Sequence, residues 1–530
     1  LPSVRPPGDA QANFISRRRN GVEMKKNKHL IIAVCVLLCV MLLTACGGGD
    51  GKATASATPA PTGSAEASAT GGTNSGSLLP PRGDNLQNAI KAGETYRYFC
   101  WAVKDENDPY SFEPTVVQEN LPKKRAELEE QYGITIKYII NDAQDWAAKV
   151  MEASLAGTPI TDILHGGGPF AMLNIYNFSS TGGRLLLQLD EYSDYADFSD
   201  PSWWRTELQQ SGYFNGHQYF AVPNVIGIEH VALNQVCIFN KSLLESAGYP
   251  ADKLYEMNQS GEWTWDKFYE VAISCTNPDT GTIGVNVGDS FSLIHSLFSS
   301  AGARAVTSET KDGATEVTFT PNTPEALEAW DFFIKLGQAG AVDYRHASGD
   351  VEIFLSGNVG MICTYFNRVI NIASSKRHPE YGILFPPKQE VEDEYTSDVN
   401  WFTPYAAMSQ ISNPAGAVQL LSLYCAPLYS AEDERNQASV EAELMQYIPD
   451  EGSLYTMNNI ADKTVDNSLA YVIYSSVSIM MSDGTASKID ALLCNYKEEF
   501  VSGAKTPAVF YASVKSGVDQ ALKDALASAE

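Results

Sequence analysis

The sequence predicts an α/β protein whose main sheet is mostly parallel, and three observations lead to this prediction. Segments with the pattern of strands alternate with segments with the pattern of helices between residues 95 and 165. Hydrophobic residues make up 44% of the chain, which is ample for a packed core. With 530 residues, the chain is long enough for two domains or for one large body of two lobes.

Five predicted elements build the parallel sheet and the helices that cover it. They are a strand at 95–101, a helix at 117–132, a strand at 134–140, a helix at 146–155 and a strand at 161–165. Gly133 and Gly157 end the two helices. This alternation favours parallel strands, because each helix returns the chain to the start of the next strand.

Ligands of parallel sheets bind at the carboxyl ends of the strands. The loops that follow Trp101 and His165 are therefore candidate ligand contacts. Three glycines come directly after His165, but they lack both the Lys-Ser/Thr of a phosphate loop and the G-x-G-x-x-G spacing. A turn, or a close approach of the backbone to a ligand, is the better interpretation of these glycines.

Extended segments are expected in the middle of the chain, at 219–224 and 231–240. Asn240 is the expected N-cap of a short helix that Gly248 ends. Thr264 is the expected N-cap of a second helix, because apolar residues follow it at helical spacing.

The C-terminal part is expected to contain one more strand and two more helices. The strand is predicted at 400–408, and the helices at 414–428 and 514–526. The acidic run at 390–394 is expected to be a solvated loop.

The N-terminal part has the pattern of a bacterial secretion signal. Residues 24–29 are basic, residues 30–43 are almost entirely apolar, and small residues lead to Cys46. The apolar run has the length of a signal-peptide core and is short for a membrane span. Leu43-Thr44-Ala45-Cys46 resembles the lipobox of bacterial lipoproteins, which implies a signal peptide at 24–45 and acylation, for example with palmitate, at Cys46. A plain secretory signal, or a membrane helix with a chance cysteine, is the alternative.

The segments around this signal are not expected to fold. Residues 1–23 match neither a signal nor a domain, and we interpret them as translated upstream sequence. Residues 46–83 combine the anchor with a disordered linker of Gly, Ser, Thr and Ala. Removal of residues 1–45 takes away seven basic and two acidic residues and leaves a formal net charge of −32. A chain of this charge repels nucleic acid and anionic lipid, so neither is an expected partner.

Six cysteines remain after the anchor, and they are far apart in the sequence. They are Cys100, Cys237, Cys275, Cys363, Cys425 and Cys494. Without a C-x-x-C pair they indicate neither a zinc site nor a disulfide framework. Most are expected to be buried small hydrophobic residues, and a single disulfide stays an open alternative.

Four stretches between residues 239 and 388 form a set. They are Phe239-Asn240-Lys241, then Trp263-Thr264-Trp265-Asp266-Lys267-Phe268, then 354–361 with the pattern F-x-x-G-x-x-x-M, and 381–388 with the sequence YGILFPPK. They resemble the motifs of family 1 extracellular solute-binding proteins, the sugar-capturing lipoproteins of ABC importers: the first two resemble the central signature of the family, and the last is close to its YGI-x-PxP pattern. The four stretches occur in the order of the family, and the resemblance covers residues 94–530.

The resemblance implies a bilobal periplasmic-binding-protein-like fold, with a ligand cleft between two α/β lobes. We expect residues 84–223 and 357–402 in the first lobe, and residues 224–356 and 403–530 in the second. The chain is expected to cross between the lobes at Pro223-Asn224 and at Phe402-Thr403, which would serve as hinges. The implied function is capture of a carbohydrate, an oligosaccharide by the size of the body, and delivery to the permease subunits of an ABC importer. The protein would be a monomer, lipid-anchored at the extracellular face of the cytoplasmic membrane, without cofactor, metal or catalytic residues.

Sugars offer hydroxyl groups for hydrogen bonds and an apolar face for aromatic stacking. The candidate ligand contacts are therefore aromatic and polar residues at strand ends or directly after the matching motifs. They are Trp101, Asp105, His165, Phe170, Tyr365, Phe366 and Trp401. The family often has a tryptophan where this chain has Tyr365 and Phe366, so the stacking geometry is left open. The aromatic residues Trp265 and Phe268 of the signature are expected in the core.

Two other functions remain as alternatives. A lipoprotein glycoside hydrolase would need two carboxylates about 5–10 Å apart, and no spaced motif nominates such a pair. H-E-x-x-H, G-x-S-x-G and Walker motifs are absent from the sequence, which disfavours peptidases, esterases and NTPases. A sensor lipoprotein of the same fold would present its ligand to a receptor instead of an importer, and fold does not separate these roles.

Overall fold

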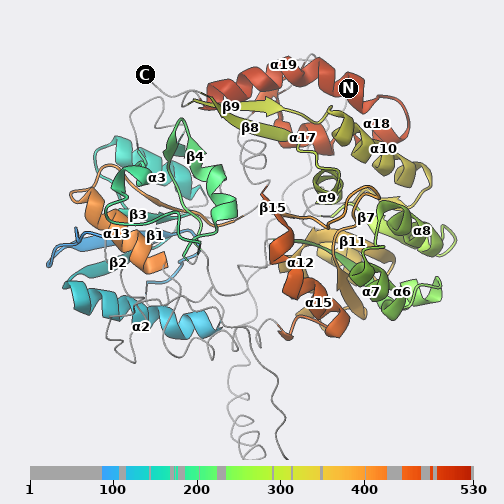
Figure 1. The fold of residues 1–530 in the computed structure, drawn as a ribbon, viewed down its shortest axis with the longest axis horizontal. Helices are drawn as coiled ribbons and strands as arrows, with labels where there is room; N and C mark the ends of the chain where they lie inside the picture. Colours follow the sequence, from blue (N-terminus) through green and yellow to red (C-terminus); the bar gives the residue numbers. More distant parts are fainter. Residues whose placement is uncertain are drawn as a thin grey trace, which may run out of the picture. The chain divides into compact units, whose positions relative to one another are not determined.

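The computed structural model describes residues 86–106, 115–141, 145–166, 172, 175–176, 185–201, 203–223, 234–288, 292–311, 314–345, 350–399, 402–425, 445–466, 478–481 and 486–526 (Figure 1). The predicted signal and linker, with Cys46, lie outside the described residues. So do Phe170, Trp401 and Asn224.

The predicted parallel sheet is confirmed. It has four strands in the order β14-β3-β1-β2. β1 (Thr95–Cys100) pairs in parallel with β2 (Thr135–Ile139) and β3 (Ile163–His165), whereas β14 (Tyr405–Ala407) runs antiparallel to β3. The helices of this sheet are α2 (Thr115–Tyr132), α3 (Trp146–Leu155) and α13 (Pro414–Cys425).

Alternating side chains of β1 pack into different cores. Tyr98 and Cys100 share a core cluster with Leu128 of α2 and with α13. Phe99 belongs to the cluster that contains Trp146 of α3. This alternation is the two-residue period of a strand, and it explains how helices cover both faces of the sheet.

A second sheet has five strands in the order β10-β7-β11-β6-β12. β7 (Ile283–Asn286), β10 (Val342–Asp343) and β11 (Val359–Tyr365) are parallel to one another. β6 (Gln235–Asn240) lies antiparallel to both β11 and β12 (Tyr381–Leu384). Its helices are α6 (Lys241–Ser246), α7 (Ala251–Ser260), α8 (Trp265–Cys275), α9 (Ser292–Ser300), α10 (Pro324–Gln338), α11 (Asp350–Leu355) and α12 (Phe366–Ala373).

The remaining elements are short or lie outside the two sheets. The first part of the chain has the 3-10 helices η1 (Leu189–Tyr192) and η2 (Thr206–Gly212) and a hairpin of β4 (Tyr213–Phe214) and β5 (His217–Gln218). A second hairpin pairs β8 (Val306–Lys311) with β9 (Ala314–Phe319). The later elements are β13 (Ser397–Val399), α15 (Glu451–Asn459), η5 (Ala461–Lys463), β15 (Thr464–Asp466), β16 (Ser478–Met480), β17 (Ala486–Lys488), α17 (Ile489–Cys494), α18 (Lys497–Val501) and α19 (Pro507–Leu526).

The expected division of the chain between the two sheets is wrong in its second half. We expected residues 357–402 in the first lobe, but β11 and β12 pair with β6 in the five-stranded sheet. We expected residues 403–425 in the second lobe, but β14 pairs with β3 in the four-stranded sheet. Antiparallel pairing between distant segments decides this, and no local pattern contains it. We therefore define the first lobe as residues 86–223 and 402–425, and the second lobe as residues 234–399 and 445–526.

Two passages of the chain between the sheets are flanked by backbone pairs. Before the passage from 223 to 234, Ala221 pairs with Tyr405; after it, Asn234 pairs with Val399. The second passage, from 399 to 402, is flanked by the same two pairs in reverse order, at Val399 before it and at Tyr405 after it. The two passages therefore begin and end together.

Two predicted helix caps had different outcomes. The side chain of Asn240 accepts a hydrogen bond from Leu243 N at 3.1 Å, which confirms the cap of α6. Thr264 occupies the N-cap position of α8, but its side chain makes no capping bond. Instead Glu390 Oε1 accepts from Asp266 N at 2.6 Å, because the backbone at Lys388 pairs with Thr264 and brings Glu390 to the helix end.

The last helix begins earlier than predicted. We expected it at 514–526, and α19 starts at Pro507. Proline suits the first position of a helix, because its missing N–H would have no partner there. Among the helices within the described residues, none combines the length and the apolar character needed to cross a membrane.

Candidate functional site

The carboxyl end of β1 holds an exposed indole on a fixed backbone. Trp101 follows β1, and the residue is 37% exposed. The backbone N–H of Trp101 donates to His165 O at 3.1 Å, and its backbone carbonyl accepts from Asn141 Nδ2 at 2.6 Å. Because the strands on either side hold both backbone groups, the indole can meet a ligand without much further ordering of the chain. Asp105 lies exposed in the loop that follows.

His165 ends β3 and is part of the core. Its side chain is 2% exposed and stacks on the ring of Tyr405, with centroids 4.1 Å apart. Its Nδ1 lies 3.0 Å from the hydroxyl of Tyr98. Burial lowers the pKa of His165 to about 3, so the imidazole is neutral at pH 7. The structure thus brings Trp101 and His165 together through a backbone hydrogen bond, but Trp101 is exposed to solvent whereas His165 lies in the core.

The carboxyl ends of β7, β10 and β11 meet in the second lobe, and a buried glutamine organises the side chains there. Gln235, the first residue of β6, lies opposite Tyr365, the last residue of β11. Its Nε2 donates to Tyr365 Oη at 3.1 Å and to Ser292 O at 3.2 Å, while its Oε1 accepts from Ser296 Oγ. Tyr365 is 7% exposed and held by this contact. Phe366 is fully buried at the start of α12.

An arginine–aspartate pair lies at the same edge, at the end of β10. Arg345 Nε donates to Asp343 Oδ1 at 2.9 Å, and Arg345 Nη2 donates to Asp343 Oδ2 at 2.6 Å. Asp343 is buried, whereas the side chain of Arg345 is 65% exposed. The carboxylate raises the pKa of Arg345, which keeps the guanidinium charged. A second pair joins α11 and α12, where Arg368 Nε lies 3.7 Å from Asp350 Oδ2.

Arg345 is the functional candidate that sequence reasoning missed. A fixed, exposed guanidinium at a strand end is a ready hydrogen-bond donor for a polar ligand. The pattern Asp-x-Arg at 343–345, directly after a short apolar strand, is the signal that could have nominated it.

The predicted hinge residues that are described lie at the ends of the two passages. Pro223 pairs with Trp204 in the first lobe. Phe402 is buried, with its ring centroid 6.4 Å from that of Phe220, and Thr403 is half-buried beside it. On the other side, Asn234 Nδ2 donates to Ser397 Oγ at 3.1 Å and to Thr464 Oγ1 at 2.9 Å. The amide of Asn234 thus links its own segment to β13 and β15, at the place where both passages enter the second lobe.

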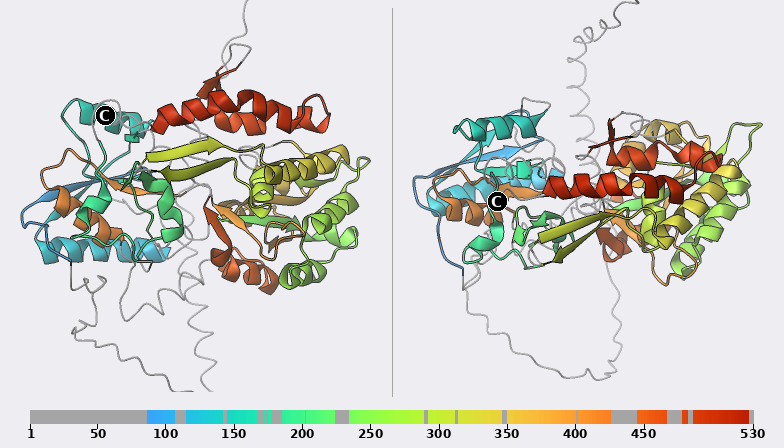
Figure 2. Two further views of the ribbon diagram at one scale, coloured as in Figure 1. Left: turned by 45° about the horizontal axis from the view of Figure 1, so that its top comes forward. Right: turned by 90° about the horizontal axis from the view of Figure 1, so that it is seen from above.

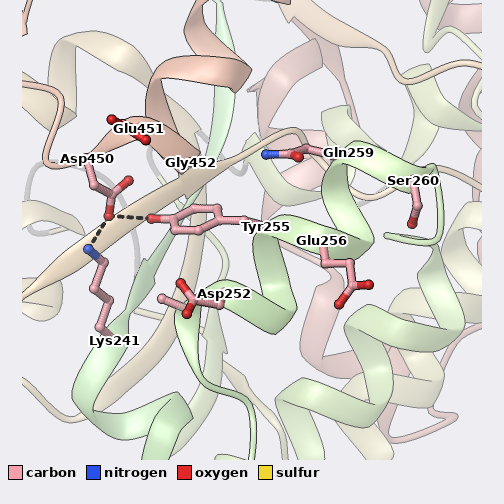
Figure 3. A pocket seen from close by; sticks show the side chains of 10 residues that line it. Lys241, Asp252, Tyr255, Glu256, Gln259, Ser260, Asp450, Glu451 and Gly452 are labelled. Carbon is pink, nitrogen blue, oxygen red and sulfur yellow. Dashed lines mark hydrogen bonds and ion pairs between the residues drawn. The ribbon is translucent and has the colours of Figure 1, made fainter.

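A groove of about 1030 Å³ lies at the other end of β6 (Figure 3). Its lining comes from α6, α7 and the start of α15, and includes Lys241, Asp252, Tyr255, Glu256, Asp450 and Glu451. Lys241 Nζ and Tyr255 Oη both point to Asp450 Oδ2. Because Lys241 follows the carboxyl end of β6 and Gln235 begins it, the groove does not belong to the edge where β7, β10 and β11 end.

Within the described ranges, no group of three or more His, Cys, Asp or Glu side chains is placed to hold a metal ion. The six cysteines are free thiols, and all but Cys494 are buried, which agrees with their expected role as small hydrophobic residues.

The described candidate contacts fall into two sets. Trp101, Asp105 and His165 lie in the first lobe, and Tyr365 and Phe366 lie in the second.

Comparison with known proteins gives the family and the fold. The family profile described as bacterial extracellular solute-binding protein matches residues 105–424. The cyclic alpha-maltosyl-1,6-maltose binding protein from Arthrobacter globiformis is 15% identical and has a TM-score of 0.56, over 82% of this chain and 100% of that one. The sugar-binding protein MalE from Xanthomonas citri is 13% identical, with a TM-score of 0.54 over 81% and 97% of the two chains. UgpB from Mycobacterium tuberculosis, solved with glycerophosphocholine, is 14% identical, with a TM-score of 0.51 over 81% and 98%.

At these identities the likeness concerns the fold alone. No curated protein sequence matches the chain.

Proposed function

The chain belongs to the family of bacterial extracellular solute-binding proteins, and from this premise we propose that it captures an oligosaccharide between its two lobes and delivers it to an ABC importer. Its fold is the bilobal α/β fold of periplasmic binding proteins, and it is a binding protein rather than an enzyme. The two solved relatives with the highest TM-scores given above are named as binders of maltose-type sugars or of sugar.

The exposed indole of Trp101 carries the proposal. An aromatic ring that is held at the carboxyl end of a parallel strand is suited to stack on the apolar face of a sugar ring. In the second lobe, the fixed guanidinium of Arg345 supplies hydrogen-bond donors for hydroxyl oxygens. A ligand that contacts both edges would stabilise the closed arrangement of the lobes, since it binds that state better than the open one.

A thermal-melting screen tests sugar capture. The protein is melted alone and with each member of a panel of monosaccharides, linear and cyclic oligosaccharides and glycerophosphodiesters. A ligand present at a hundred times its dissociation constant stabilises the folded state by about 2.7 kcal/mol, which raises the melting temperature. A shift with one class of oligosaccharide, with no product by chromatography, is the expected result. A shift with glycerophosphodiesters alone would contradict the proposal, and cleavage of a sugar would overturn the binding function itself.

The lipid anchor at Cys46 is part of the proposal and has its own test. The cysteine follows the lipobox-like Leu43-Thr44-Ala45, and two or three acyl chains at about 0.8 kcal/mol per buried methylene make a stable anchor. In a bacterial host, the native chain is expected to take up labelled palmitate and to sediment with membranes. Cys46→Ser should lose both properties, whereas Cys39→Ser in the signal should keep them. Label that persists in Cys46→Ser would contradict the anchor.

A further inference from the structure

Two hairpins from different lobes meet tip to tip. Asn215 forms the turn between β4 and β5 in the first lobe, and Thr315 lies near the turn between β8 and β9 in the second. Asn215 N donates to Thr315 Oγ1 at 3.1 Å, and Thr315 N donates to Asn215 Oδ1 at 3.3 Å. Each residue thus offers both a backbone donor and a side-chain acceptor to the other. The hairpin of β8 and β9 can be followed toward β4 in Figures 1 and 2.

The first hairpin is fixed within its own lobe. Asn215 has a φ of 50°, a left-handed conformation that asparagine tolerates better than most residues. Its Nδ2 donates to Tyr176 Oη at 2.7 Å, and the ring of Tyr176 stacks on Phe214 with centroids 5.0 Å apart. On β5, Gln218 N donates to Oδ1 of Asp190 in η1 at 2.8 Å. The Asn215 side chain is therefore held in position by its own lobe.

The second hairpin is fixed by the C-terminal helix. Phe319 N donates to Asp519 Oδ1 at 2.8 Å, and Lys515 Nζ donates to Phe319 O at 2.7 Å, so both backbone groups of Phe319 are bound to α19. Phe319 is also buried against Tyr511 of the same helix. The base of the hairpin is thus anchored in the second lobe, and Thr315 is carried near its tip.

We propose that Asn215 and Thr315 are positioning residues for ligand capture, which latch the two lobes together. The inference rests on the proposed function, since it assigns the pair to the closure of the lobes on a ligand. Neither residue belongs to the stretches of chain that join the lobes at 223–234, 399–402 and 425–445, so the contact ties the lobes at a separate point. Movement of the lobes away from each other has to break it.

The chemistry of the contact suits repeated opening. Both residues are half-buried, so water can replace the two hydrogen bonds when the tips separate. The net contribution of such a bond is small, because protein–water bonds are exchanged for protein–protein bonds. A latch of this strength shifts the population of closed molecules without locking them, and the apparent affinity for a ligand scales with that population.

Small-angle X-ray scattering of the ligand-free protein tests the latch. Thr315→Val removes one acceptor, and Asn215→Gly removes the other without straining the positive φ. Each change is expected to raise the ratio of open to latched molecules about fivefold, which enlarges the radius of gyration. Thr315→Ser and Asn215→Asp keep the acceptor oxygens and should restore the native radius. Thr318→Val, at an exposed position of the same strand β9, is the matched control and should change nothing.

A second experiment does not depend on the size of that shift. The double variant Asn215→Cys with Thr315→Cys is treated with an oxidant, and crosslinking is read as a reducible change in gel mobility and intact mass. Rapid crosslinking is expected, and the pair Asn215→Cys with Thr318→Cys should crosslink far more slowly. Unchanged scattering in the folded latch variants, or absence of the crosslink, would overturn the proposal. Because neither readout needs a ligand, a sugar panel that fails leaves the latch testable, and a failed latch leaves sugar capture standing.

Discussion

The strand ends of the two lobes differ in the way they treat their polar groups. In the first lobe, an exposed indole sits above a core in which His165 packs between aromatic rings. In the second, Gln235 and its partners form a buried polar network, and only Arg345 presents a largely exposed side chain among the edge residues described above. The difference suggests a division of tasks, in which the first lobe offers a surface for stacking and the second offers directed hydrogen bonds on a rigid support.

The largest effect is expected from the centre of the polar network. Gln235→Leu leaves Tyr365 Oη, Ser296 Oγ and Ser292 O without the partner that Gln235 provides. At about 1 kcal/mol for each buried group, the free energy of unfolding should fall by about 3 kcal/mol in urea denaturation. Gln259→Leu, at an exposed position of α7, is the matched control and should stay within about 0.5 kcal/mol. A loss below 1 kcal/mol for Gln235→Leu would mean that the second edge is not a rigid support.

The next prediction concerns the pH dependence of stability, to which each lobe contributes one buried histidine. Burial lowers the pKa of His165 to about 3 and that of His295, on α9, to about 4, from 6.5. Below pH 6.5 the unfolded chain takes up protons that the folded chain refuses, so stability falls as the pH falls toward these values. His165→Phe should reduce the loss of stability between pH 7 and pH 4 by about 3 kcal/mol, since the unfolded imidazole titrates over about 2.5 pH units of this range at about 1.4 kcal/mol each.

His295→Phe should reduce that loss by the same amount or less, because its shift is the smaller one. His378→Phe, an exposed position, controls for the loss of a histidine. The measurement is the melting temperature of each variant across this pH range. An unchanged pH profile in His165→Phe would place the imidazole in contact with water and would reopen its role as a ligand contact.

The third prediction turns to binding. Trp101→Ala should lower the affinity for the captured ligand at least tenfold, because a stacking aromatic ring at a binding surface commonly carries such a contribution. Stability should change by less than 1 kcal/mol, since the indole is exposed. Tyr455→Ala, an equally exposed aromatic residue on α15, is the matched control for titration calorimetry. Equal affinity of Trp101→Ala and the native chain would remove the first lobe's stacking surface from the proposal.

The sequence predicted those features that depend on neighbouring residues. The alternation of strand and helix around β1, α2 and β2 is visible within short windows, and so is the cap at Asn240. The assignment of β11 to the second sheet was not visible, because it depends on the register of Met361 opposite Phe239. The same limit applies to Glu390, which caps α8 from a distant loop.

The sequence nominated strand ends as candidate ligand contacts, but it did not contain the exposure of each side chain. Exposure depends on which face of the structure a side chain meets. That is why Trp101 lies outside and Phe366 lies in the core, although both follow a strand. Arg345 could be recognised as a candidate only from the structure, which shows that its guanidinium is held by the buried carboxylate of Asp343.

The smallest effect is expected for Tyr365→Phe, which tests whether the second lobe also contacts the ligand through an aromatic residue. Tyr365→Phe keeps the ring and removes the hydroxyl that accepts from Gln235 Nε2, so stability should fall by about 1 kcal/mol. Because the ring is almost buried, we expect the affinity to change less than threefold, in contrast to Trp101→Ala. Tyr455→Phe serves as the exposed control, and calorimetry with urea denaturation gives both quantities. A larger drop in affinity than in stability would assign ligand contact to the Tyr365 hydroxyl, and the two edges would then share the binding rather than divide it.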